Sequence, residues 1–247
     1  MPKQLNTLRL LLIQARTDQD ILLQEQQCFI ERCKITPDQL DTINICQETL
    51  PPQLFELYDV LLIGGAGEFS ATENYSWTPA LLSLIKEADK RGFPTFGSCW
   101  GHQMIARALG GTVVYDADLT EMGCHWVELN EAGTQDLLFS HFPTRFKANM
   151  GHHDRVSILP DGAVNLAFSD TQSNQAFRMA GKPIYGTQFH SELDAQREKE
   201  RLYAYRSHYT EVSSEEEFQS IIEGLAETTE VDELLYKFLS TCVAARW

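Results

Sequence analysis

Short apolar runs alternate with longer amphipathic segments through the first half of the chain. Apolar runs with the length of buried strands lie at residues 8–14 and 58–63, and we expect further strands at residues 40–45 and 94–96. Helical patterns cover residues 18–33 and 78–91. A third helical pattern follows a turn at residues 97–101 and runs to residue 109. Strands that are buried on both faces and alternate with helices are typical of βαβ units. We therefore expect an α/β fold with an open, mostly parallel twisted sheet and helices on both faces.

The pattern changes between residues 113 and 189, where strand-like segments follow one another with few helices between them. These segments lie at residues 122–129, 146–150, 164–168, 176–179 and 184–189. Strands that follow one another without helical crossovers usually pair antiparallel, and sheets that mix both pairings are common. We expect an antiparallel edge or subsheet attached to the parallel sheet.

The last part of the chain is acidic and has the apolar spacing of helices. Residues 211–247 hold nine acidic and two basic residues, together with two stretches whose apolar residues recur at helical spacing. Ser214 and Glu217 form a capping box ahead of the first stretch. We expect residues 193–247 to be an acidic helical C-terminal extension packed on a domain formed by residues 1–192. The alternative is that its apolar stripes are a docking surface for another protein.

Composition and charge narrow the function classes. Of the 247 residues, 43% are hydrophobic and 22% charged, which excludes a coiled coil and a disordered chain. The net charge of −15 has the wrong sign for binding phosphate backbones or anionic lipid, so we expect neither nucleic acid nor a membrane as a partner. No apolar run has the length of a membrane helix, so we expect neither a membrane-spanning helix nor a secretory leader. The six cysteines include no CxxC pair, so we expect reduced thiols and a cytoplasmic protein.

One cysteine stands in a setting that indicates chemistry. Residues 97–101 read GSCWG, which is the pattern of a nucleophile elbow with Cys99 as the nucleophile. A sharp strand-to-helix turn requires small residues two before and two after the nucleophile, and Gly97 and Gly101 meet this requirement. The helix that begins there offers unpaired N–H groups and the positive end of its dipole to developing negative charge. Alone the pattern is a weak signal, because glycines flank cysteines in many loops.

A histidine and a carboxylate follow the strand expected at residues 184–189. His190 can exchange a proton with the sulfur and the leaving group, while Glu192 can hold the other ring nitrogen and fix the tautomer. Such a pair also occurs exposed at strand ends or as half of a metal site. Residues 152–154 (HHD) add candidate ligands for a zinc or iron centre, which is the less favoured interpretation.

Four segments together resemble the class I, triad-type glutamine amidotransferases. They read GGAG at residues 64–67, GSCWGHQ at 97–103, MGHHDRV at 150–156 and YGTQFHSE at 185–192. The third is similar to the MSHGDxV segment of the glutaminase domain of GMP synthase, and the likeness is greatest to stand-alone GMP-synthase-like amidotransferases. The resemblance runs from about residue 8 to residue 192, with the motifs in the family's order. The SGGxDS loop of the ATP-pyrophosphatase half of GMP synthase is absent from the sequence.

The resemblance implies a catalytic triad. Cys99 would attack the glutamine amide, His190 would be the general acid and base, and Glu192 would orient the histidine. Ammonia would leave behind a γ-glutamyl thioester, which water would hydrolyse. Because the family assigns these residues to thiol chemistry, we expect no metal and no cofactor. Where the family usually has proline between its histidine and glutamate, this chain has Ser191, which leaves Glu192 less constrained.

The resemblance also implies the groups that contact the substrate. The backbone N–H groups of Gly65 and Trp100 would form the oxyanion hole, and Gln103, Gly151 and His153 would bind the substrate. His153 stands where glycine is usual, so we expect the shape of the glutamine pocket to differ at this position.

Three functions agree with these residues. The first is a glutamine amidotransferase that delivers ammonia to a separate synthetase partner. The second is an independent γ-glutamyl hydrolase or peptidase, which forms the same thioester from a substrate with a larger leaving group. The third is a non-catalytic binding or regulatory module that keeps the fold.

Overall fold

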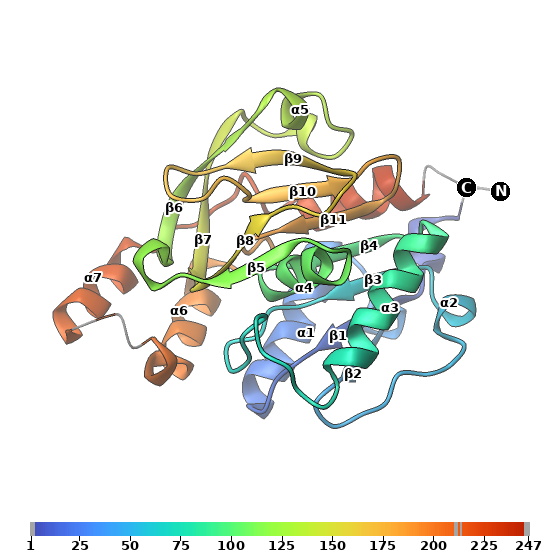
Figure 1. Ribbon diagram of the computed structural model, residues 1–247, viewed down its shortest axis with the longest axis horizontal. Coiled ribbons are helices and arrows are strands. Elements are labelled where there is room, and N and C mark those ends of the chain that lie inside the picture. The colour runs from blue at the N-terminus through green and yellow to red at the C-terminus, as the bar shows by residue number, and fades with distance from the viewer. Residues whose placement is uncertain (1–2, 210–211, 213, 245–247) are drawn as a thin grey trace.

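A nine-stranded sheet forms the centre of the molecule (Figure 1). The computed structural model describes residues 3–209, 212 and 214–244. Five neighbouring strands are parallel, in the order β2 (Leu40–Asn44), β1 (Leu10–Gln14), β3 (Val60–Ile63), β4 (Thr95–Ser98) and β11 (Ile184–Thr187). Their carboxyl ends therefore share one edge of the sheet.

The other four strands continue the sheet in antiparallel pairing. They follow β11 in the order β10 (Ala176–Met179), β9 (Ala163–Phe168), β6 (Glu121–Leu129) and β7 (Arg145–His152). The expected α/β fold, with a mostly parallel sheet and an antiparallel part, is confirmed.

Helices cover both faces of the parallel half. They are α1 (Gln19–Cys33), α3 (Thr78–Arg91) and α4 (Trp100–Ala108), with a shorter one at α2 (Leu54–Leu57). A further short helix, α5 (Glu131–Thr134), lies against β9 and β6 of the antiparallel part. On β1, Leu10 and Leu12 face a core cluster shared with α1, whereas Leu11 and Ile13 face a cluster shared with α3 and α4. All residues of β1 are buried, which explains why this strand is a continuous apolar run rather than an alternating one.

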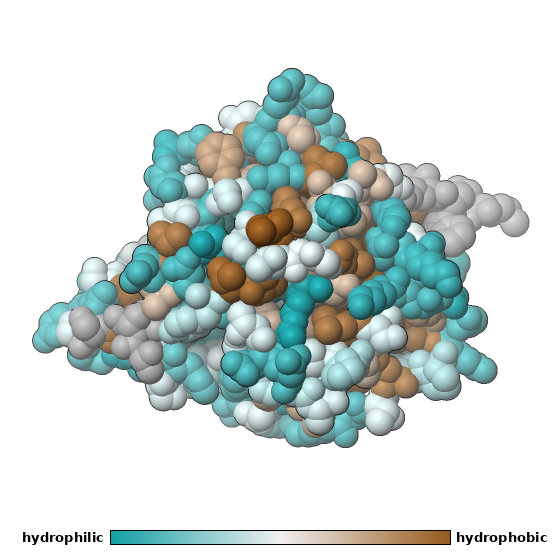
Figure 2. Space-filling view, viewed as in Figure 1, coloured by the Kyte–Doolittle hydropathy of each residue, from teal (hydrophilic) through white to brown (hydrophobic). Residues whose placement is uncertain are grey.

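A second sheet of two antiparallel strands lies outside the main one. Strand β5 (Thr112–Tyr115) pairs with β8 (Asp154–Ile158). The hydrophobic pattern did not predict either strand, because both are short and partly exposed; Ile158 is 63% exposed. Figure 2 shows hydrophobic side chains gathered near the centre of the viewed face, where β5 and β8 run in Figure 1.

The C-terminal extension packs on the sheet of its own chain. Its elements are α6 (Ala195–Ala204), α7 (Glu215–Gly224), α8 (Leu234–Lys237) and a π-helical turn, η6 (Phe238–Val243). The ring of Phe238 lies 5.4 Å from that of Phe96 on β4 and 5.9 Å from that of Tyr185 on β11. The apolar stripe of α8 and η6 therefore covers the sheet.

The helix ends in the extension agree only partly with the sequence pattern. Ser214 caps α7 as expected, because its hydroxyl accepts the N–H of Glu217 at 3.1 Å. The second apolar stretch forms a helix only from Leu234, because the chain first makes a turn in which the N–H of Val231 donates to the carbonyl of Thr228. Residues 210–211, 213 and 245–247 of the expected extension lie outside the described residues. Across the described ranges, no helix has both the length and the apolar character that crossing a bilayer requires.

Candidate active site

Cys99 occupies the sharp turn between β4 and α4. Its φ of 49° and ψ of −103° lie in a region that non-glycine residues rarely adopt, so the turn stores backbone strain. A Cβ on Gly97 would lie 2.5 Å from the carbonyl carbon of Gly101, and a Cβ on Gly101 would lie 2.2 Å from the carbonyl oxygen of Ile63. The turn therefore has the geometry that the GSCWG motif predicts, with both glycines required by close approach.

Loops from three parallel strands meet around Cys99. Residues 64–67 follow β3, Cys99 follows β4, and the loop containing His190 follows β11. Strands β4 and β11 pair in register, and the N–H of Cys99 donates to the carbonyl of Thr187 at 2.8 Å. The parallel topology thus brings segments far apart in the sequence to one edge of the sheet, where open α/β folds usually bind ligands.

Glu192 holds His190 and is itself held. The Nδ1 atom of His190 lies 2.7 Å from Oε1 of Glu192, and the Ser98 hydroxyl donates to Oε2 at 2.7 Å. Burial raises the pKa of Glu192, but His190, Arg201 and Ser98 outweigh burial and lower it to about 2. With Nη1 of Arg201 at 3.5 Å from Oε1, these contacts supply the constraint that Ser191 was expected to remove.

The surroundings of His190 favour the protonated form of its ring. Burial lowers its pKa, but the charges of Glu192 and Cys99 outweigh burial and hold the pKa well above the ordinary value of histidine. The side-chain amide of Gln188 donates to the sulfur of Cys99 at 3.7 Å. Sequence reasoning did not single out Gln188, although it lies in the same motif as His190.

A cavity of about 230 Å³ opens on one side of Cys99. Gln103, Gly151 and His153, the substrate contacts that the resemblance implies, all line it. The Nε2 atom of Gln103 donates to the backbone carbonyl of Asp154 at 2.6 Å, which fixes the side chain in the wall. This cavity is where the structure gathers the expected glutamine-binding residues.

The two adjacent histidines have different surroundings. The ring of His153 lies 5.7 Å from that of Tyr115 and 5.3 Å from that of Tyr209, so it forms part of the cavity wall. His152 is buried, and its Nε2 lies 3.1 Å from Oε2 of Glu121, which makes it a structural hydrogen-bonding residue. In the part of the chain that the structure describes, no group of three or more His, Cys, Asp or Glu residues is arranged to hold a metal ion.

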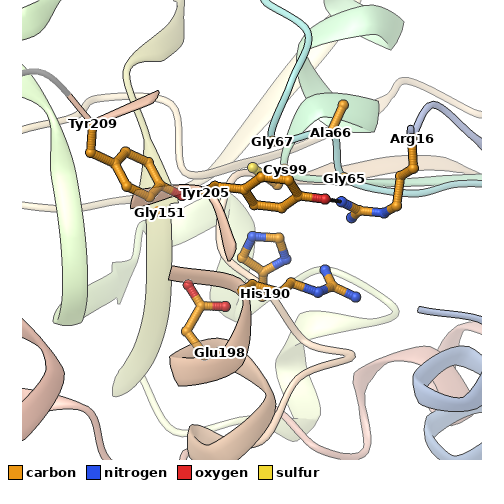
Figure 3. A pocket seen from close by; sticks show the side chains of 11 residues that line it. Arg16, Gly65, Ala66, Gly67, Cys99, Gly151, His190, Glu198, Tyr205 and Tyr209 are labelled. Atoms are coloured by element: carbon orange, nitrogen blue, oxygen red, sulfur yellow. Dashed lines mark hydrogen bonds between the residues drawn. The ribbon is translucent and has the colours of Figure 1, made fainter. Parts of the chain in front are cut away.

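A smaller cavity, of about 20 Å³, lies on the His190 side of Cys99 (Figure 3). Five of its eleven lining residues come from α6, the turn after it and the loop after β1: Arg16, Glu198, Arg201, Tyr205 and Tyr209. Figure 3 shows the Glu198 carboxylate turned toward the space beside the His190 ring. Sequence reasoning missed the four that follow residue 192, because it placed that part of the chain in an extension outside the site.

The two implied oxyanion donors differ in their surroundings. Trp100 is the first residue of α4, so its N–H has no acceptor within the helix. The N–H of Gly65 donates to Oε1 of Glu25 at 3.1 Å. In this structure the N–H of Gly65 is therefore already used in a hydrogen bond and is not free to receive an oxyanion. A fully buried carboxylate such as that of Glu25 requires hydrogen-bond donors.

A buried ion network that sequence reasoning missed lies beneath this loop. Arg16 donates to Glu25 through Nη2 at 2.6 Å and Nε at 3.0 Å. Burial raises the pKa of Glu25, but Arg16, followed by Arg201, outweighs burial and lowers it. The available signal was that Glu25 falls on the same face of the helix as Leu22 and Phe29, where a lone charge needs a buried partner.

Comparison with known proteins agrees with this geometry. The family model for Glutamine amidotransferase class-I matches residues 25–209. The chain belongs to the class-I glutamine amidotransferase family. The match extends through α6, so the residues named in the wall of the smaller cavity lie within the matched region, with the exception of Arg16.

Individual relatives carry the same family assignment. A glutamine-hydrolyzing GMP synthase subunit from Methanosarcina barkeri is 38% identical over 181 residues, which is 72% of this chain and 87% of the relative. The subunit of the same name from Archaeoglobus fulgidus is 32% identical over 151 residues, 60% of this chain and 74% of the relative. The crystal structure of a glutamine amidotransferase from Thermotoga maritima has a TM-score of 0.74 and 25% identity, covering 94% of this chain and 96% of its own.

Proposed function

We propose that this class-I glutamine amidotransferase hydrolyses the side-chain amide of glutamine to glutamate and ammonia. The observation that carries the proposal is the pairing of His190 with Glu192 at 2.7 Å, beside the thiol of Cys99 on its strained turn. The larger cavity receives the glutamyl part of the substrate, with Gln103 and Gly151 in its wall. A nucleophile, an oriented base and an adjacent pocket are the parts that acyl transfer requires.

Acylation begins with the proton of Cys99 held on His190, so that the Cys99 thiolate attacks the amide carbon. The C–S bond forms, and the carbonyl oxygen becomes an oxyanion. His190, whose raised pKa keeps the ring protonated, donates its proton to the amide nitrogen as the C–N bond breaks. Ammonia and a γ-glutamyl thioester on Cys99 result.

Hydrolysis of the thioester uses the same histidine in the opposite direction. His190, now neutral, takes a proton from a water molecule whose oxygen attacks the thioester carbon. The C–O bond forms, the C–S bond breaks, and glutamate leaves. Glu192 keeps the ring in one orientation through both steps.

The backbone N–H of Trp100 is the oxyanion donor that this structure supports. It adjoins Cys99 at the start of α4, where the helix dipole favours negative charge. The second implied donor, the N–H of Gly65, serves only if it leaves Glu25.

We further propose that the ammonia is passed to a separate synthetase partner in the cytoplasm. Two relatives support this proposal. The matched regions cover 74% and 87% of their own length, and both are named as subunits of GMP synthase. Six free cysteines, including the proposed nucleophile, agree with a reducing compartment.

Ammonia and glutamate release by the purified chain tests this function. The wild type is expected to produce both in equal amounts from free glutamine, and more rapidly once a synthetase partner is added. Cys99→Ala is expected to abolish both products. A matched control is Cys124→Ala, which removes a thiol that lines neither cavity and should leave the rate unchanged.

A panel of γ-glutamyl compounds separates the rival functions. Turnover of γ-glutamyl peptides in place of glutamine would support the γ-glutamyl hydrolase. Absence of turnover, together with failure of a glutamine-analogue chloroketone to label Cys99, would support a non-catalytic module.

A further inference from the structure

The two cavities that meet at Cys99 hold different parts of the substrate. Of the expected glutamine contacts, Gln103 and His153 line only the larger one and Gly151 lines both, whereas His190 and Glu198 line only the smaller one. Because His190 gives its proton to the departing nitrogen, that nitrogen lies on the side of His190. The smaller cavity is therefore where the leaving group is released.

The smaller cavity has room for one small molecule. A water needs roughly 10–15 Å³ of such space, and the cavity provides about 20 Å³. Ammonia is similar in size to water, so it is accommodated. An amine that carries a carbon substituent needs more than this space.

Glu198 places a buried acceptor in this cavity. Its side chain is 2% exposed, and Oε2 has no hydrogen-bond partner among the described residues. Buried polar atoms nearly always have a partner, and a carboxylate oxygen without one is costly. The Glu198 carboxylate therefore indicates that a molecule with N–H or O–H groups binds here.

Arg201 limits what that molecule can be. It is 4% exposed, and Nη1 and Nη2 have no hydrogen-bond partner within the described ranges, although Nη1 lies 3.5 Å from Glu192. The N–H groups of Arg201 are donors and Oε2 of Glu198 is an acceptor. In a space of this size they match a small molecule that both donates and accepts hydrogen bonds. Ammonia and water have this property.

We propose that the smaller cavity is a leaving-group chamber that admits only an unsubstituted amide nitrogen, with Glu198 as the acceptor of its N–H. The inference rests on the proposed glutaminase function and narrows the substrate class to primary γ-amides. Glu198 aligns the nitrogen so that its lone pair faces the protonated His190 ring while the C–N bond breaks.

The same chamber then serves the second half of the reaction. Once ammonia has left, one water takes its place, with one O–H donated to Glu198 and the other to the neutral ring of His190. Its oxygen forms the C–O bond as the C–S bond to Cys99 breaks, and the proton returns to His190. Two successive molecules of equal size and hydrogen-bonding capacity thus use one site.

Two substitutions of Glu198 test its two functions separately. Glu198→Gln keeps the volume but replaces the charged acceptor, so kcat/KM for glutamine should fall by roughly 10- to 100-fold. Glu198→Ala also opens the chamber. Wild type should prefer glutamine over γ-glutamylmethylamide by about 10- to 200-fold, and this preference should shrink only in Glu198→Ala.

Controls distinguish the chamber from a structural effect. Glu200→Gln alters an exposed carboxylate on the same helix and should match wild type. Alkylation of Cys99 by a glutamine-analogue chloroketone needs no amine leaving group, so both Glu198 variants should keep its rate within about twofold.

The outcomes separate the two proposals. Glu198 variants that retain wild-type turnover and preference would overturn the chamber alone, as would a parallel loss of alkylation and hydrolysis. A wild type without Cys99-dependent ammonia release would overturn the proposed function, and the chamber with it.

Discussion

Arg16 and Glu25 form a buried ion pair beneath the loop that leads into the active site. Nη2 of Arg16 lies 2.6 Å from Oε1 of Glu25, and the two side chains are 1% and 0% exposed. Nη1 of Arg16 also donates to the hydroxyl of Tyr205 at 2.7 Å. The pair therefore links the end of the first strand and the first helix to the turn after α6.

Removal of one partner should be strongly destabilising. Glu25→Ala leaves Arg16 as an uncompensated buried charge, and we expect the free energy of unfolding to fall by about 3–5 kcal/mol, measured by urea denaturation. The exposed pair of Arg9 and Asp41 is the control; Asp41→Asn should cost no more than about 1 kcal/mol. Similar losses in the two variants would contradict the structural importance of the buried pair.

The hydrogen bond from Ser98 to Glu192 should contribute to catalysis rather than to substrate binding. Ser98→Ala removes a donor to a buried carboxylate, which is worth about 1.5–3 kcal/mol. We expect kcat for glutamine hydrolysis to fall by about tenfold or more with little change in KM. Steady-state kinetics check this, with Ser157→Ala, a serine outside the site, as the control. A raised KM at constant kcat would contradict the assignment.

The negative charge of Glu192 should set the alkaline limit of activity. That charge raises the pKa of His190, so Glu192→Gln lowers the pKa of the ring. Acylation uses the protonated ring, and kcat/KM should therefore decline at lower pH in the variant than in wild type. Rates of glutamine hydrolysis across the neutral and alkaline range measure this. If the alkaline limb of the pH–rate profile lies at the same pH in wild type and Glu192→Gln, His190 is not the acid of acylation.

Gly101 and Gly224 should respond in opposite ways to alanine. A Cβ at Gly101 meets the backbone oxygen of Ile63 at 2.2 Å, whereas a Cβ at Gly224 meets nothing within 4 Å. We expect Gly101→Ala to cost at least about 1–3 kcal/mol and to lower the reactivity of Cys99, while Gly224→Ala should stabilise by about 0.4–1 kcal/mol. Thermal unfolding and chloroketone labelling report both effects. Full labelling of Gly101→Ala would contradict the need for close packing at the turn.

The sequence predicted the parallel part of the sheet because four of its five strands are buried on both faces. Continuous apolar runs such as residues 60–63, when helical patterns separate them, are typical of buried parallel strands. The elbow was predictable for a local reason, since Gly97 and Gly101 stand at fixed distances from Cys99. Strand β5 was not, because its exposed residues carry a weak pattern.

The sequence did not predict which elements complete the site. Periodicity marks the buried face of a helix, but it does not say what that face meets. Glu25, Glu198 and Arg201 lie on such faces, and only the tertiary arrangement joins them around the loop at residues 64–67. For the same reason, the hydrogen bond that occupies the N–H of Gly65 could not be read from the motif.

The most direct test of the account is detection of the covalent intermediate. Wild-type protein mixed with glutamine, quenched in acid and digested should yield a peptide with one γ-glutamyl group on Cys99 by mass spectrometry. Cys99→Ala should yield none. Ammonia release without any such adduct, or with the adduct on another cysteine, would contradict the account.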